Sequence, residues 1–143
     1  MLENYELDAA KSLLPMKSYQ LHIHLSEATA IKIGKLGVFL FPQGSYIYTG
    51  SAKKNMDARI QRHLRKQKKL KWHIDYLTSH PNVKITRVNL FDEDECLLNQ
   101  RTSGQILIPR FGASDCKHDC ESHLKYLGVN NPQKGLIGTN LAY

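Results

Sequence analysis

Two tyrosines, one arginine and one glutamate have the side chains needed to hydrolyse a phosphodiester bond. Tyr19 and Tyr48 fall on strand-like segments, and Gly50 allows close backbone approach where the second segment ends. Arg59 falls on the following helical segment, and Glu95 at the start of a later helix. Phosphodiester hydrolysis needs a base for water, a cation for the charge at phosphorus, and a carboxylate for a hard cation such as Mg²⁺. These residue types could supply those parts, although on the residues alone Tyr19 and Tyr48 are more often simple sheet aromatics and Arg59 is one phosphate contact among many.

A basic tract surrounds this arginine. Between Lys53 and Lys71 there are nine basic residues and one acid, Asp57, so the local charge is +8 against +7 for the whole chain. Such a tract is typical of a protein that binds a phosphate backbone with release of counterions, although a solvated helix face is the alternative. The residues expected to contact nucleic acid are Lys53, Lys54, Arg62, Arg65, Lys66, Lys68, Lys69 and His73.

The tract contains an amphipathic helix, predicted from about Met56 to Gln67. Met56, Ile60 and Leu64 recur at a helical spacing and form its buried stripe. Arg59, His63 and Lys66 share an adjacent face, so all three can reach one ligand.

The elements that must position these residues predict an α+β fold, in which helices flank a small, mostly antiparallel sheet. Ser18–Ser26 alternates as a half-buried strand, with His22 and His24 on the solvent side or at an edge. The other expected strands are a hairpin of 31–33 with 38–41, then 45–49, 83–90 and 105–108. The other expected helices are 4–14 and 72–79, and a segment through Leu98 that has capping-box spacing between Asp92 and Glu95. Residues 123–127 are expected to form one or two helical turns.

Length and composition predict one soluble domain over residues 1–143. The chain is 41% hydrophobic and 23% charged, which fits a globular domain. No apolar run approaches the roughly 20 residues that a membrane span needs, and the first residues lack a secretory signal, so no membrane partner and a cytoplasmic location are expected.

The cysteines are Cys96, Cys116 and Cys120, an odd number that argues against a secreted disulfide framework. Cys116, His118, Cys120 and His123 fall within eight residues, whereas structural zinc usually takes its ligands from two separated segments. Zinc is therefore not expected here, and local packing is the preferred interpretation of the Cys116/Cys120/His123 cluster.

The stretch Tyr48-Thr49-Gly50-Ser51-Ala52, followed by Arg59 to His63, resembles the second half of the GIY-YIG nuclease signature. The first half would fall on Lys17-Ser18-Tyr19, where Lys17 and Ser18 replace Gly and Ile, and residues 26 to 45 insert an extra hairpin between the two halves. A closer similarity is to a branch of that superfamily, a domain of unknown function that also occurs fused to endonuclease III-type glycosylases. It covers a core of about 17–127, with 1–16 as an N-terminal helical extension and 128–143 as a tail. The shared segments are Gly44 to Ala52, Arg59 with Arg62-His63, Trp72 to Leu77, Glu95-Cys96, Phe111 to Cys116, and Ser122 to Leu124.

This resemblance implies a metal-dependent DNA endonuclease or nuclease-like repair factor. Tyr19 and Tyr48 would line the site, with one as general base or water positioner. Arg59 would stabilise the phosphoryl charge with support from His63, and Glu95 would bind one Mg²⁺ or Mn²⁺. Two alternatives remain: a catalytically inactive nucleic-acid-binding module, and a docking domain for a repair glycosylase. Glu95 also has a structural alternative, as the capping-box residue of its helix.

Overall fold

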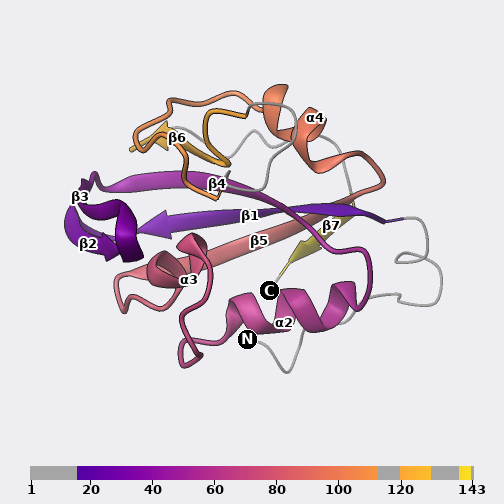
Figure 1. Cartoon of the computed structure of the whole chain (residues 1–143), viewed down its shortest axis with the longest axis horizontal. Helices are drawn as coiled ribbons and strands as arrows, with labels where there is room; N and C mark the ends of the chain where they lie inside the picture. Colours follow the sequence, from indigo (N-terminus) through magenta and orange to yellow (C-terminus); the bar gives the residue numbers. More distant parts are fainter. Residues whose placement is uncertain (1–15, 113–119, 130–138, 143) are drawn as a thin grey trace.

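The computed structural model describes residues 16–112, 120–129 and 139–142 (Figure 1). Within them the chain forms an antiparallel five-stranded sheet in the order β6-β4-β1-β5-β7, which confirms the α+β prediction. The strands are β1 (Ser18–Leu25), β4 (Gly44–Ser51), β5 (Val83–Phe91), β6 (Leu124–Gly128) and β7 (Thr139–Ala142). The predicted helix at 4–14 lies outside the described residues.

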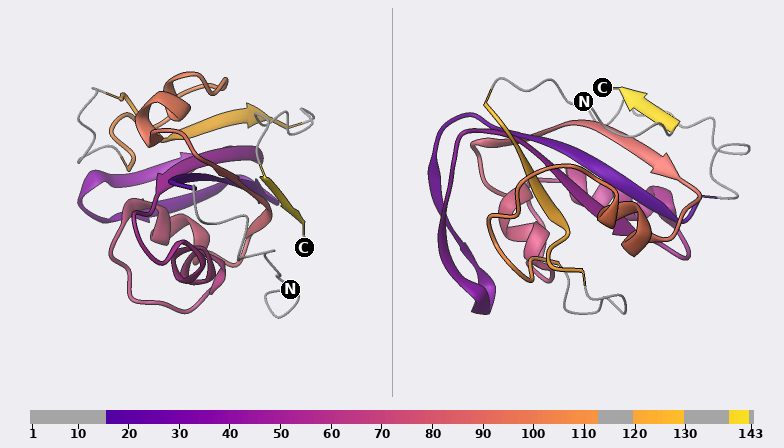
Figure 2. Two further views of the ribbon diagram at one scale, coloured as in Figure 1. Left: turned by 90° about the vertical axis from the view of Figure 1, so that its right-hand side faces the viewer. Right: turned by 90° about the horizontal axis from the view of Figure 1, so that it is seen from above.

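Helices cover both faces of this sheet. The helices α2 (Met56–Leu64) and α3 (His73–Thr78) lie against one face, and α4 (Glu95–Gln100) lies on the opposite side (Figures 1 and 2). The apolar residues of the central strand β1 face α2 and α3 and are at most 1% exposed; they are Tyr19, Leu21, Ile23 and Leu25.

The other face of β1 is buried as well, so the prediction of a half-buried strand with outward histidines is wrong for His22. Gln20 and His22 are both fully buried, and only His24 is partly exposed. The Gln20 amide donates to the hydroxyl oxygens of Thr49 and Thr102, and His22 pairs with the Asn89 side chain. Alternation could not show that the polar side of β1 is covered by other parts of the chain.

The predicted hairpin forms a separate two-stranded sheet of β2 (Thr29–Ile33) and β3 (Gly37–Phe41), joined by a 3-10 turn at Gly34–Leu36. Ile31, Ile33 and Phe41 bury it against the core, and β2 lies beside α3. The inserted hairpin therefore lies beside α3, one of the two helices on that face of the sheet.

Two predictions in the C-terminal half are wrong. Residues 123–127 were expected to be helical, but Leu124–Gly128 is a strand that pairs with β4. The expected strand at 105–108 is irregular, and Gln105 alone makes a bridge, to Tyr126. In both cases pairing with a distant segment decides the conformation, and a local pattern does not contain it.

Helix α2 ends at Leu64, three residues before its predicted end, because Arg65 is extended. The Lys68 ammonium then folds back and donates to the carbonyls of Arg62 and His63 in the last turn of the helix, and the Arg62 carbonyl also accepts from the Arg65 N–H. One lysine of the basic tract therefore closes the helix.

A buried carboxylate joins α2 to α3. Asp75 is fully buried, and the Arg62 guanidinium donates to both of its oxygens, at 2.8 and 2.9 Å. The backbone N–H groups of Lys71 and Trp72 donate to it too. Burial acts to raise the pKa of Asp75, but the Arg62 hydrogen bonds and these backbone donors outweigh it, so the pKa is lowered. Asp75 therefore stays ionised and Arg62 holds it.

We expect Arg62→Ala to lower the free energy of unfolding by about 3–5 kcal/mol, because it leaves the buried Asp75 charge without its partner. The matched control is Arg65→Ala, at an exposed position of the same tract, where the loss should stay within about 0.5 kcal/mol. Urea unfolding of the two variants measures both values. Equal losses would show that Asp75 does not depend on Arg62.

Candidate active site

The end of β4 and the start of α2 bring the predicted site residues together. After Ser51 the Ala52 N–H donates to the Lys17 carbonyl, and Asn55 takes a left-handed conformation just before the helix begins. Met56 and Ile60 then face the core, as predicted. This orientation points His63 at the sheet and leaves Arg59 at the end of β4.

Tyr19 and His63 make the central contact. The Tyr19 Oη lies 2.6 Å from His63 Nε2, and both residues are 1% exposed. Gly50 is paired with Tyr19 across the two strands, and a Cβ built on it would lie 2.6 Å from Tyr19 Oη and Cζ. Only glycine at position 50 leaves room for the Tyr19 ring to reach His63.

Both groups of this pair are neutral near pH 7. Burial, reinforced by the nearby Lys68 charge, lowers the pKa of His63 to about 3. Burial also raises the pKa of Tyr19, although the Arg59 charge acts in the opposite direction. The contact is therefore a neutral phenol against a neutral imidazole, with one proton between the two atoms.

Tyr48 lies beside this pair and contacts it through its ring. Its ring meets the edge of the His63 ring at 6.1 Å and of the Phe111 ring at 6.3 Å between centroids. Tyr48 is 8% exposed, and burial raises the pKa of its hydroxyl. In this arrangement Tyr48 forms the apolar wall of the site.

Arg59 lies closer to the surface than the tyrosines. Its Nη1 donates to the Ser51 carbonyl at 3.0 Å, and the guanidinium carbon lies 4.7 Å from the centroid of the Trp72 ring. These two contacts position the planar guanidinium at the mouth of the site, where its other N–H groups can serve a bound anion.

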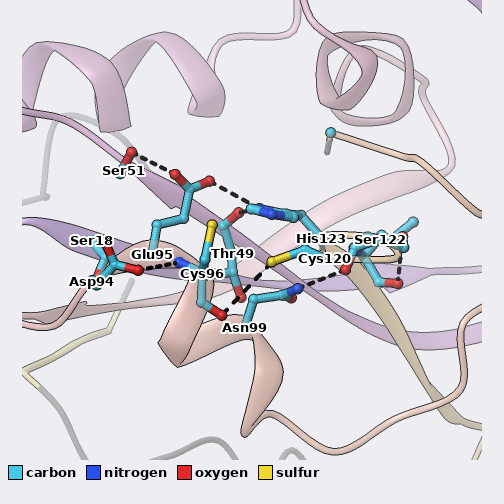
Figure 3. Close-up of polar contacts among 12 residues, drawn as sticks. Ser18, Thr49, Ser51, Asp94, Glu95, Cys96, Asn99, Cys120, Ser122 and His123 are labelled. Carbon is cyan, nitrogen blue, oxygen red and sulfur yellow. Dashed lines mark hydrogen bonds and ion pairs between the residues drawn. The ribbon is translucent and has the colours of Figure 1, made fainter. Parts of the chain in front are cut away.

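Glu95 is the first residue of α4, and it does not form the expected capping box with Asp92. The N-cap is Asp94, whose carboxylate accepts from the N–H groups of Cys96 and Leu97. Glu95 instead accepts from the Ser51 hydroxyl at 2.7 Å and lies 2.9 Å from His123 Nδ1 (Figure 3). Its side chain is 26% exposed. The cap-only interpretation of Glu95 is therefore wrong.

Ser51 links the arginine to the glutamate, since its carbonyl accepts from Arg59 and its hydroxyl donates to Glu95. Neither Ser51 nor His123 could be assigned a role from the sequence, although both belong to the segments that carry the family resemblance. Ser51 lies opposite Ser18 at the end of β4, and the pairing of β6 with β4 sets His123 beside Thr49.

The basic tract divides into two groups. Arg62, Lys66 and Lys68 make intramolecular contacts: Lys66 donates to the carbonyls of Thr78, His80 and Val83, and Lys68 also donates to the Thr78 hydroxyl. The exposed basic side chains are Lys53, Lys54, Arg65, Lys69 and Lys71, together with the partly bound Lys66.

His73, the remaining residue expected at a nucleic-acid surface, is also held internally. Its Nδ1 accepts from the Gly112 N–H at 2.9 Å, and its ring packs against Phe111. Partial burial lowers its pKa. In this structure His73 fixes the backbone at Gly112 and the ring of Phe111.

The fold and the site define a small α+β protein with a tyrosine, histidine, arginine and glutamate cluster where a sheet meets two helices. The chain belongs to the family described as Domain of unknown function DUF123, whose profile matches residues 18–140. No curated protein and no solved structure matches the chain. Among the described residues, no helix combines the length and apolar character that crossing a membrane requires.

The buried imidazole makes stability depend on pH. Unfolded His63 binds a proton below about pH 6.5, whereas folded His63 binds one only below a pKa of about 3. The unfolded state therefore holds more protons in this window, and the stability contributed by neutral His63 is complete above pH 6.5 and is lost as pH falls toward 3. Between pH 7 and pH 5 the loss should be about 2 kcal/mol.

We expect His63→Gln to lack this part of the pH dependence when urea unfolding is compared at pH 7 and pH 5. His24→Gln, at a partly exposed position of β1, is the control for loss of an imidazole. A His63→Gln curve parallel to that of the wild type across this window would contradict the assignment of a buried, neutral His63.

Proposed function

We propose that this protein is a metal-dependent DNA endonuclease of the GIY-YIG type, which hydrolyses phosphodiester bonds at the Tyr19–His63 pair. The observation that carries the proposal is the convergence of this pair, Arg59 and Glu95 from β1, α2 and α4. The segment from Tyr48 to Ala52, together with Arg59 and His63, resembles the GIY-YIG nuclease signature, and this resemblance supports the same function. Packing could explain each contact alone, but not the approach of both groups to the end of β4, where Gly50 lies against Tyr19 and Ser51 bridges Arg59 and Glu95.

The Tyr19–His63 pair supplies the base. A water proton passes to Tyr19 Oη while the Tyr19 proton passes to His63 Nε2, 2.6 Å away. The hydroxide oxygen forms the new bond to phosphorus, the bond from phosphorus to the leaving sugar oxygen breaks, and solvent protonates that oxygen. The lowered pKa keeps His63 neutral but weakly basic, and it accepts this proton once a substrate anion nearby raises that pKa toward the working pH.

Arg59 stabilises the charge that develops on the phosphoryl oxygens. Its contacts with Ser51 and Trp72 fix the guanidinium before substrate arrives, so little reorganisation is needed. The exposed residues Lys53 and Lys54 follow β4 at the same end of the sheet and would hold the flanking phosphates.

A hard divalent cation fits this donor set. Glu95 is partly exposed, and the Ser51 hydroxyl oxygen lies 2.7 Å from it, so a carboxylate and a hydroxyl are together as oxygen ligands. Mg²⁺ is commonly held by one or two carboxylates and keeps several waters. Such an ion would supply Lewis-acid stabilisation of the phosphate, and Mn²⁺ would serve equally.

A second candidate is a nucleic-acid-binding module without catalysis. It is favoured by the burial of the tyrosines, since Tyr19 is 1% exposed and must be uncovered before it meets water. The exposed part of the basic tract would serve this function unchanged. Docking onto a repair glycosylase is a third outcome, and it predicts no DNA binding near physiological salt.

We expect the protein to nick supercoiled or branched DNA in Mg²⁺ or Mn²⁺ but not in EDTA. Arg59→Ala and Glu95→Ala should each lower the rate by about 100-fold or more, because each removes charge stabilisation specific to the transition state. DNA binding in both variants should stay within a few-fold of the wild type. Lys84→Ala and Glu27→Gln, both exposed and outside the basic tract, are the controls and should cut normally.

Undiminished nicking in Arg59→Ala and Glu95→Ala would place the chemistry elsewhere. Salt-dependent binding without nicking on any substrate would support the binding module. Absence of both activities would leave the docking function.

A further inference from the structure

Beside the proposed active site, three side chains that ligate soft metals meet. Cys96 comes from α4, and Cys120 and His123 from the segment before β6. One ligand atom from each, the two sulfur atoms and an imidazole nitrogen, lie within 4.8 Å of one another (Figure 3). The sequence argued against zinc because its candidates crowded into one stretch, and the fold supplies Cys96 from a separate element.

We propose that Cys96, Cys120 and His123 bind a zinc ion, distinct from the divalent cation at Glu95. Two thiolates and one imidazole are a donor set that zinc prefers, and hard Mg²⁺ does not. Tetrahedral zinc with bonds of about 2.0–2.3 Å sets ligand atoms roughly 3.5–3.8 Å apart. The 4.8 Å limit holds for the two sulfur atoms and one of the two imidazole nitrogens, so these atoms would have to close by about 1 Å.

Glu95 orients the His123 ring for metal binding. The His123 Nδ1 lies 2.9 Å from the Glu95 carboxylate and 3.1 Å from the Thr49 carbonyl, so Nδ1 carries the proton and metal would be bound through Nε2. A carboxylate on the far nitrogen is the usual partner of a zinc-bound histidine, because it fixes the ring and raises its basicity.

The two segments that carry the ligands are also fixed to each other. The Asn99 amide donates to the Ser122 carbonyl at 2.7 Å, and the Lys125 ammonium donates to the carbonyls of Asn99 and Thr102. The Cys120 thiol itself lies 3.8 Å from the Cys96 carbonyl. These contacts hold α4 against the segment before β6, so metal binding would order little that is not already in place.

The three protein ligands leave a fourth position for water or a further protein group. Because Glu95 touches both His123 and Ser51, it connects this centre with the proposed phosphodiester site. Zinc would thereby hold Glu95 and, through Ser51, the carbonyl that positions Arg59. The proposed role is therefore structural support of the site, and it does not require that the protein be a nuclease.

The test is a Co²⁺ titration of the metal-free, reduced full chain, followed by addition of Zn²⁺. We expect one Co²⁺ per chain with a thiolate-to-cobalt charge-transfer band, and displacement of that Co²⁺ by Zn²⁺. Cys96→Ser and Cys120→Ser should each lose most of the band. Glu95→Gln should keep it but bind zinc about 10–100-fold more weakly.

His22→Asn removes another buried imidazole and should bind Co²⁺ as the wild type does. The wild-type titration decides the proposal even where a cysteine variant fails to fold. Absence of a thiolate band, or the same band and zinc affinity in both cysteine variants, would overturn it. A Cys96–Cys120 disulfide in place of metal binding would overturn it too. DNA is absent from the titration, so its result is independent of the nicking assay.

Discussion

The hydrogen bond between Tyr19 and His63 is the contact on which the rest of the candidate site depends. It joins the central strand to α2 through two side chains that are each 1% exposed. The pair forms only because Gly50 lacks a Cβ that would overlap the Tyr19 ring. Once α2 is fixed in this way, Arg59 lies above the end of β4 and within reach of the Ser51 carbonyl. The Tyr19–His63 contact between two neutral side chains thus sets the position of the Arg59 guanidinium, which is proposed to contact the substrate phosphate.

Some basic side chains of the tract make contacts within the fold, and others are exposed and are proposed to bind nucleic acid. Arg62 holds the buried Asp75, and Lys68 closes α2, so these two residues stabilise the elements around His63. Lys53 and Lys54 are exposed at the end of β4 and would give the proposed phosphate-binding surface its charge. Glu95 contacts two groups of residues. Ser51 links it to Arg59, and His123 links it to Cys96 and Cys120.

The sequence predicted what depends on local pattern. The strands around Tyr19 and Tyr48 follow from alternation, and the buried stripe of Met56 and Ile60 follows from helical spacing. It did not predict β6, the burial of His22, or the approach of Cys96 to Cys120 and His123. Each depends on which distant segments meet, as with the pairing of β6 with β4. For the same reason the internal roles of Arg62, Lys66 and Lys68 could not be separated from surface charge before the fold was known.

The central claim is that the Tyr19 hydroxyl accepts the proton of the attacking water. Strand β1 places this hydroxyl within hydrogen-bond distance of His63. The most direct measurement is the single-turnover rate of strand cleavage by Tyr19→Phe, which removes one oxygen and keeps the ring that packs over Gly50. The account predicts a rate at least about 100-fold below that of the wild type. DNA affinity should be unchanged and the fold intact. Cleavage by Tyr19→Phe at the wild-type rate would contradict the claim.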